Sequence, residues 1–207
     1  MKNNSWFITG ISTEVGKTVA AAVVARALGA DYWKPVQAGD LHDTDSDKVG
    51  RWLAGTDSVI HPEAHRLNTP MSPHAAAEID KVQIDPKQIK RPKTERDLVI
   101  EGAGGLLVPL NETDTIADLI LPQDKVILVS RHYLGSINHT LSSIECIRSR
   151  GLNLYGVLFM GEQHPTTEDI IQKMGQVKVI GRIDWEPYID HHVISEYAAL
   201  IEDELNG

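Results

Sequence analysis

Several features that mark other classes of protein are scarce or missing in this 207-residue chain. Its single cysteine, Cys146, excludes an intramolecular disulfide. Residues 1–5 contain no hydrophobic stretch, so we expect no secretory signal. No apolar run approaches the length that spans a bilayer. We therefore expect a cytoplasmic protein with no membrane partner.

Basic residues are also fewer than acidic residues. The chain has 20 lysines and arginines against 29 aspartates and glutamates, a formal net charge of −9. This balance disfavours general binding to nucleic acid or to anionic membranes, although it permits a local cationic pocket. The length fits one domain, and there is no repeat, low-complexity tract or linker. We expect residues 1–207 to form a single domain.

Short apolar runs alternate with helical patterns along most of the chain. Runs typical of strands that are covered on both faces occur at 98–100, 126–129, 154–160 and 177–180. Alanine-rich or amphipathic segments occur at 20–28, 136–150, 166–174 and 194–205. This order predicts an α/β fold with a doubly wound, mainly parallel sheet flanked by helices.

The stretch 58–96 interrupts the alternation with five prolines. We expect one helix at 74–79 and another after Pro86, within an insertion that forms surface structure around a site or a partner contact. Before it, a short strand is expected at 32–36, which Pro35 ends or places at an edge. A helix is expected at about 46–53, after an acidic loop.

The loop between an apolar run at 6–8 and the alanine-rich segment has the order strand, loop, helix that a phosphate-binding loop requires. Gly16 lets backbone N–H groups close around phosphate oxygens at a helix start. Lys17 can reach the β- and γ-phosphates, and the Thr18 hydroxyl can bind Mg²⁺. The first glycine is Gly10 rather than residue 11, so the loop is one residue longer than the strict pattern. These residues predict a nucleotide site in a P-loop NTPase-like fold.

Ligands of such sheets gather beyond the carboxyl ends of the strands. There, Glu101 follows a buried run and is a candidate magnesium ligand, with a capping carboxylate as the alternative. Asp47, in the acidic loop, is a second candidate, with a solvated cap as its alternative. Lys34 can add positive charge around a transferring phosphoryl group, unless it is an ordinary surface lysine. We expect Lys17 and Lys34 to be exposed within the site.

Two further features lie at strand ends. Gly135 opens the helix that follows the run at 126–129, a geometry that can bind a carboxylate or phosphate. An ordinary N-cap at Ser136 is the alternative. Trp185 follows the last strand, where it either packs in the fold or lines a base pocket.

Taken together, the motifs resemble those of the dethiobiotin synthetase family, ATP-dependent enzymes that close the ureido ring in biotin synthesis. The likeness covers nearly the whole chain. It rests on five segments: 13–18 (TEVGKT), 34–36 (KPV), 72–74 (SPH), 101–105 (EGAGG) and 134–139 (LGSINH).

The resemblance implies that 7,8-diaminopelargonate, CO₂ or bicarbonate, and ATP react through a carbamate and a carbamic–phosphoric mixed anhydride. It implies catalytic roles for Thr13, Lys17 and Lys34, and a Mg²⁺ cofactor held by Thr18, Asp47 and Glu101. The nucleotide-binding residues it implies are Glu14, Val15, Gly16, Lys17, Thr18, Val19, Asp47, Glu101, Gly102, Ala103, Gly104, Gly161 and Ile183. The substrate-binding residues are Thr13, Lys34, Ala38, Gly135, Ser136, Ile137 and Asn138, the last four from the other subunit of a homodimer.

The chain departs from the family pattern at two places. Ala38 stands where the family usually has a Ser or Thr that contacts substrate, so one hydrogen bond of ~1 kcal/mol is missing or comes from elsewhere, for instance Gln37. Met160 and Gly161 stand where an Asn-Asp pair commonly reads adenine. We therefore expect weak discrimination among nucleoside triphosphates, or readout by backbone groups near Gly161 and Ile183.

A partitioning or scaffold ATPase of the same fold, acting as a nucleotide switch, is the main alternative. Such proteins usually carry a second lysine early in the phosphate loop. Here the corresponding positions hold Ser12, Thr13 and Glu14. The loop therefore favours the synthetase.

Overall fold

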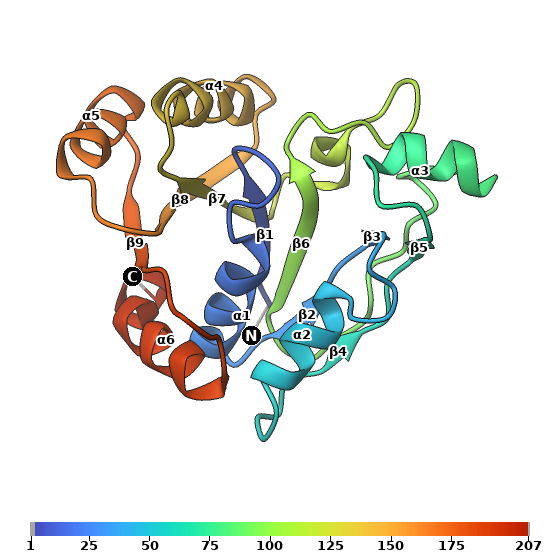
Figure 1. The fold of residues 1–207 in the computed structure, drawn as a ribbon, viewed down its shortest axis with the longest axis horizontal. Helices are drawn as coiled ribbons and strands as arrows, with labels where there is room; N and C mark the ends of the chain where they lie inside the picture. The colour runs from blue at the N-terminus through green and yellow to red at the C-terminus, as the bar shows by residue number, and fades with distance from the viewer. Residues whose placement is uncertain (1–2, 207) are drawn as a thin grey trace.

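A seven-stranded parallel sheet forms the centre of the computed structural model, which describes residues 3–206 (Figure 1). Its strands are ordered β4-β2-β6-β1-β7-β8-β9. They span Ser5–Gly10 (β1), Asp31–Trp33 (β2), Ile60–His61 (β4), Leu98–Gly105 (β6), Lys125–Arg131 (β7), Asn153–Met160 (β8) and Val179–Ile183 (β9). Strands β3 (Val36–Ala38) and β5 (His65–Leu67) pair separately, also in parallel.

Helices cover both faces of the sheet, as Figure 1 shows with α4 and α5 above it and α1 and α6 below. The helices span Lys17–Leu28 (α1), Asp45–Trp52 (α2), Pro73–Asp80 (α3), Ser136–Ser149 (α4), Pro165–Gly175 (α5) and His191–Asn206 (α6), with a 3₁₀ turn at Ile116–Leu119. Each face has its own buried apolar core. The expected doubly wound parallel α/β fold is confirmed.

Helix α1 is buried because its middle consists of small side chains. Residues 20–25 are completely buried between the sheet and α6. Alanine favours the helix and lets it approach the sheet closely. Gly29 then ends the helix in the left-handed conformation, with φ of 57°. The position of α1 fixes the loop before it at the carboxyl edge of the sheet.

The proline-rich stretch differs in part from the expectation. Its β4 extends the main sheet, so this segment is not confined to the surface. Helix α3 forms as expected, but the helix predicted after Pro86 is wrong. The chain makes a single turn there, in which Asp85 accepts hydrogen bonds from the Lys87 N–H and the Gln88 side chain. This local bonding replaces the helical pattern.

Pro35 acts as expected, because β2 ends at Trp33 and β3 begins at Val36. Strand β6, in contrast, continues beyond Ile100 to Gly105. Over residues 3–206, no helix has both the length and the apolar character needed to cross a membrane.

Candidate functional site

The loop between β1 and α1 closes tightly around two glycines. A Cβ added to Gly10 would lie 2.6 Å from Val15 Cγ2, so only glycine fits there. Gly16 caps α1 with φ of 90°, a conformation that glycine adopts without strain. Lys17 begins the helix, and its Nζ donates to the Ser12 carbonyl at 3.1 Å. The early glycine at residue 10 is thus part of the fold of the lengthened loop.

Glu101 collects three hydrogen-bond donors beside this loop. Thr18 Oγ1 donates to its Oε1 at 2.9 Å, and Lys34 Nζ donates to the same oxygen at 3.1 Å. The Tyr32 hydroxyl donates to Oε2 at 2.7 Å. Lys34 also pairs with Asp45, at the start of α2. Elements β2, β6, α1 and α2 therefore meet in one network of charges and hydrogen bonds.

The two lysines are buried, so the expectation that they are exposed is wrong: Lys17 is 7% and Lys34 5% exposed. Burial lowers the pKa of Lys17 to about 8, although Glu101 acts in the opposite direction. Burial also acts to lower the pKa of Lys34, but Glu101 and Asp45 outweigh it and the pKa is raised. Lys34 is therefore held as a cation, whereas Lys17 forms no ion pair with a carboxylate among residues 3–206.

Asp47 does not reach this network. Its carboxylate accepts hydrogen bonds from the N–H and hydroxyl of Thr44, and the Thr44 hydroxyl accepts from the Asp47 N–H. This capping box begins α2 and holds an exposed carboxylate. The structure instead brings Asp45, two residues earlier, to Lys34. The side-chain oxygens in this network that could bind a metal ion are those of Thr18, Glu101 and Asp45.

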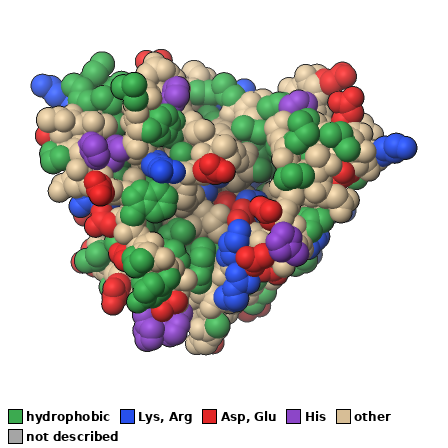
Figure 2. Space-filling model, in the orientation of Figure 1, with side chains coloured by type: hydrophobic (Ala, Val, Ile, Leu, Met, Phe, Trp, Pro, Cys, Tyr) green, Lys and Arg blue, Asp and Glu red, His purple; other side chains and the backbone are tan. Residues whose placement is uncertain are grey.

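A cavity of about 1110 Å³ opens beside the network. Figure 2 shows the hollow near the centre of one face, where basic and acidic side chains meet. Its polar end is formed by the loop, Lys34, Asp45 and Glu101, and its other end has an apolar wall. That wall includes Val36, Ala38, Pro70, Met71, Leu106, Leu107 and Val108. One cavity thus combines a phosphate-type site with room for a hydrocarbon chain.

Most residues expected at the nucleotide and substrate sites line this cavity. They are Thr13, Glu14, Gly16, Lys17, Thr18, Val19, Lys34, Ala38, Glu101, Ala103 and Gly104. Val15 is instead buried in the core, and a Cβ on Gly102 would meet Ile116 at 3.0 Å. These two positions support the loop and strand rather than facing the cavity.

Ala38 presents only a methyl group to the cavity. Its neighbour Gln37 also lines the cavity and is nearly buried. The Gln37 amide donates to the Gly39 carbonyl at 2.9 Å, while its Oε1 has no partner among residues 3–206. Gln37 therefore holds a buried acceptor oxygen next to the position where the expected hydroxyl is missing.

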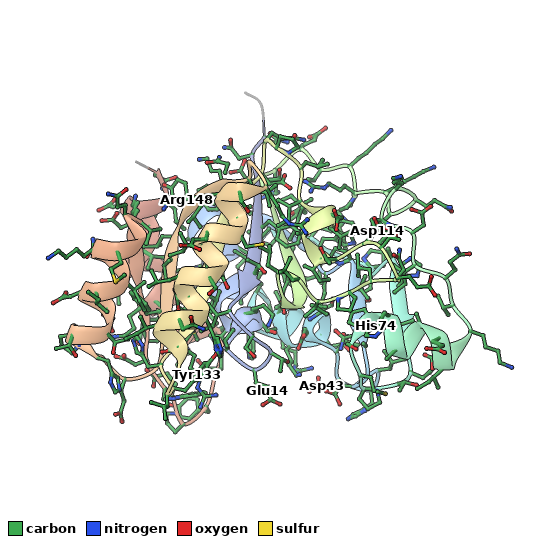
Figure 3. All side chains as sticks on the ribbon, turned by 90° about the horizontal axis from the view of Figure 1, so that it is seen from above. Glu14, Asp43, His74, Asp114, Tyr133 and Arg148 are labelled. Atoms are coloured by element: carbon green, nitrogen blue, oxygen red, sulfur yellow. The ribbon has the colours of Figure 1, made fainter. Side chains whose placement is uncertain are left out.

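The start of α4 is separate from the cavity of its own chain, since none of residues 135–138 lines it. Gly135 caps the helix with φ of 102°, and Leu134 before it is fully exposed. In Figure 3, Tyr133 lies along the same edge of the molecule as Glu14 of the phosphate loop and Asp43. The α4 start thus faces outward at the edge that carries the cavity.

The two positions at the end of β8, Met160 and Gly161, do not present a side chain that could read a base. Met160 is buried and packs against the phosphate loop, where a Cβ added to Gly16 would lie 2.5 Å from the Met160 Cε. The Gly161 N–H donates to the Ile183 carbonyl at 2.8 Å, so these two backbone groups bind each other. Trp185, in contrast, lines the cavity.

Two residues of this network, Tyr32 and Asp45, were not identified from the sequence. Tyr32 stands two positions before Lys34, and the two-residue period of a strand was the available signal that both point to one side. Asp45 follows Thr44, whose side chain is a typical N-cap. A helix start fixed at Thr44 would have indicated that Asp45 and Asp47 point in different directions.

Comparison with known proteins adds sequence and fold relationships. A family model described as an AAA domain matches residues 4–193. The ATP-dependent dethiobiotin synthetase BioD of Christiangramia forsetii is 64% identical over 201 residues, 97% of each chain. The protein of that name from Cytophaga hutchinsonii is 48% identical over 200 residues, 96% of this chain and 97% of its own.

Solved structures show the same fold at much lower identity. A plasmid partition protein from Borrelia burgdorferi superposes with a TM-score of 0.61 and 14% identity, covering 100% of this chain and 99% of its own. Identity this low supports a common architecture and nothing about activity.

Proposed function

Because the chain belongs to the ATP-dependent dethiobiotin synthetase family, we propose that its cavity binds ATP and 7,8-diaminopelargonate and joins CO₂ to the latter. The reaction is an ATP-dependent ligation in biotin biosynthesis, and dethiobiotin, ADP and phosphate are its products. The cavity itself carries the assignment of the site, because it joins the phosphate loop, the Lys34–Glu101–Asp45 network and an apolar wall. We propose a cytoplasmic location, where ATP is supplied.

The proposed reaction has three steps. One amine of the substrate adds to CO₂ and loses a proton, giving a carbamate. A carbamate oxygen then attacks the γ-phosphorus of ATP, the bond from that phosphorus to the bridging oxygen breaks, and ADP leaves, which gives a carbamic–phosphoric mixed anhydride. The second amine attacks the carbamoyl carbon, phosphate leaves with the C–O bond electrons, and the amine proton is released as the five-membered ring closes. No covalent bond to the protein forms, so the residues act by position and charge.

Lys17 and Lys34 supply the positive charge that these steps require. Lys17, at the first turn of α1, is proposed to bind the phosphates, and Lys34 is proposed to act on both the phosphates and the carbamate. Both ammonium groups lie in a largely buried site, where a charge acts more strongly than in water. Thr13 lines the loop side of the cavity and is proposed to contact the reacting amine. The carbon chain would then lie along the wall that includes Ala38 and Met71.

The residues present fit a magnesium ion. Thr18 Oγ1, Glu101 and Asp45 supply hydroxyl and carboxylate oxygens, the ligands that Mg²⁺ prefers, close to one another at the phosphate end of the cavity. When bound with ATP, the ion would neutralise charge on the β- and γ-phosphates. We propose Asp45 as the α2 ligand in place of Asp47, which is occupied in the capping box of its helix.

We also propose that the chain works as a homodimer in which residues Gly135, Ser136, Ile137 and Asn138 serve the partner's cavity. A substrate with a terminal carboxylate needs an anion site at the far end of its carbon chain. The α4 start could serve as such a site, because Gly135, Ile137 and Asn138 are exposed at a helix N-terminus and do not line the cavity of their own chain. The exposed Leu134 and partly exposed Tyr133 beside it provide apolar area for subunit contact.

One experiment tests the proposal directly. The protein is mixed with diaminopelargonate, bicarbonate, Mg²⁺ and ATP, and dethiobiotin is measured by mass spectrometry. We expect product at the expense of one ATP per ring closed, and none from a Lys17→Ala variant. ATP hydrolysis without dethiobiotin, stimulated by a protein partner, would instead support a nucleotide switch of the partition type.

A further inference from the structure

Trp185 and Arg131 are stacked at the rim of the cavity. The Arg131 guanidinium carbon lies 4.6 Å from the centroid of the Trp185 ring, within the range of a cation–π contact. Arg131 Nη1 also donates to the Glu14 carbonyl of the phosphate loop at 3.2 Å. Arg131 thus ties the indole to the phosphate loop across the ends of β7 and β9.

The indole is held from a second side by Gly161. A Cβ at this glycine would lie 3.2 Å from Trp185 Nε1 and 3.3 Å from Cδ1, and the backbone has φ of 90°. Position 161 is therefore both unfavourable for a side chain and crowded by the indole edge. The Nε1 edge of Trp185 stands close to where a base-reading side chain of residue 161 would begin.

One face of the indole remains open. Arg131 covers one face and Gly161 meets one edge, yet Trp185 is 61% exposed and lines the cavity. Large aromatic rings are normally covered in a folded protein, and an open ring beside a nucleotide site is a suitable surface for a base. Residues 160 and 161 do not read a base edge, since Met160 is buried and the Gly161 N–H is bonded to the Ile183 carbonyl.

We propose that the nucleotide base stacks on the free face of Trp185, and that Arg131 is a positioning residue that holds the indole against the phosphate loop. The proposal rests on the proposed function in one respect, that the nucleotide phosphates bind at Lys17. The base is then selected by its aromatic face, which all four bases have, rather than by its hydrogen-bonding edge. The enzyme accepts GTP, CTP and UTP as well as ATP, with purines favoured by their larger ring area.

Nucleotide binding tests this without turnover. Tryptophan fluorescence is titrated with ADP, GDP, CDP and UDP in the presence of Mg²⁺. Trp6 and Trp33 are buried in the cores, and Trp52 is partly buried, donates to the Ile189 carbonyl and does not line the cavity. The exposed Trp185 is therefore expected to give the main quenching signal, which a Trp185→Phe variant loses. Equilibrium dialysis then gives dissociation constants for all variants. We expect the four nucleotides to bind wild type within about tenfold of one another.

Variants separate stacking from a structural effect. We expect Trp185→Ala to raise the dissociation constant of every nucleotide about tenfold or more, Trp185→Phe to restore most of the affinity, and Arg131→Ala to cause a smaller rise. The matched control is Tyr188→Ala, which removes an exposed aromatic ring three residues along and should change nothing. In the steady state, Trp185→Ala should raise KM for the nucleotide far more than it lowers kcat.

Two outcomes overturn the proposal: unchanged nucleotide affinity in a folded Trp185→Ala protein, or strict ADP selectivity that depends on another side chain. Thermal melting of each variant shows whether it is folded, and Trp185→Phe remains informative if the alanine variant is not. Failure of the proposed function looks different. The chain would then bind nucleotides through Trp185 and still make no dethiobiotin.

Discussion

Lys34 and Glu101 form a buried ion pair in which Nζ lies 3.1 Å from Oε1, with the two side chains 7% and 1% exposed. Asp45 is the second carboxylate on the same ammonium. A Lys34→Ala variant leaves Glu101 buried without its cation. We expect it to lose about 3–5 kcal/mol of unfolding free energy, because an uncompensated charge stays in the interior. Urea unfolding measures the loss, and dethiobiotin formation should be abolished.

A double variant separates stability from catalysis at this pair. Lys34→Met combined with Glu101→Gln removes both charges and keeps similar volumes, so much of the lost stability should return. Activity should not, because the charge on the phosphates and carbamate stays unbalanced. A Lys34→Ala protein that unfolds at the same urea concentration as wild type would contradict the buried pair.

The two aspartates of α2 should differ in their effect on magnesium. Asp45→Asn removes a carboxylate from the loop side, and we expect the Mg²⁺ concentration for half-maximal activity to rise tenfold or more. Asp47→Asn is the matched control at a distance of two residues. It should leave the Mg²⁺ requirement unchanged and lower the melting temperature slightly, because the capping box is weakened.

The reverse result would mean that Asp47 leaves its cap to bind the metal. In that case Asp47→Asn, and not Asp45→Asn, raises the Mg²⁺ requirement. Both variants are measured at saturating ATP and diaminopelargonate, so that a change in metal affinity is not mistaken for a change in substrate affinity.

The sequence predicted those parts of the site that are built from residues adjacent in the chain. The strand, loop and helix around Gly16 and Lys17 are contiguous, and the strand that carries Glu101 is a continuous apolar run. The choice between Asp45 and Asp47 was harder, because both belong to one acidic stretch. Residues two apart on a helix point to different sides, so a shift of two residues in the helix start exchanges their roles.

Contacts between distant segments could not be predicted in this way. Lys34 was expected to be exposed, and it is buried because its partner Glu101 lies 67 residues further along the chain. The stacking of Trp185 on Arg131 likewise depends on how β7 and β9 are placed around β8. Composition around each residue contains no information about such pairs.

Nucleotide binding should take up a proton at mildly alkaline pH. The pKa of Lys17 is about 8 in the free protein, against an ordinary value of 10.5. Phosphate charges favour the protonated form and raise the pKa again. We expect proton uptake on ATP binding at pH 8.5, and an affinity that falls as pH rises above about 8. Calorimetry in two buffers of different ionisation enthalpy measures the uptake.

Lys17→Arg is the control, because arginine stays charged throughout this pH range and should show no uptake. The lowered pKa of Lys17 also affects the stability of the free protein. Between pH 8 and 10.5 the unfolded chain binds more protons at Lys17 than the folded chain, so this group makes the unfolding free energy increase with pH. In Lys17→Met that contribution should disappear. Equal proton uptake by the wild type and Lys17→Arg would show that another group titrates.

The subunit contact is testable through Leu134, which is fully exposed beside the α4 start. A Leu134→Asp variant places a charge in the apolar area that we assign to the dimer, so we expect monomers in analytical ultracentrifugation at micromolar concentration. Dethiobiotin formation should fall with dimer content, because the substrate carboxylate loses its site. ADP binding should persist, since the phosphate loop of each chain is complete.

Leu200→Asp provides the matched control, since Leu200 is a well-exposed leucine on α6, away from the α4 start. This variant should remain dimeric and active, because a charge on an exposed helix face costs little. A wild-type protein that sediments as a monomer while forming dethiobiotin would contradict the shared site. The α4 start would then have to reach the cavity of its own chain, from which residues 135–138 are absent in this structure.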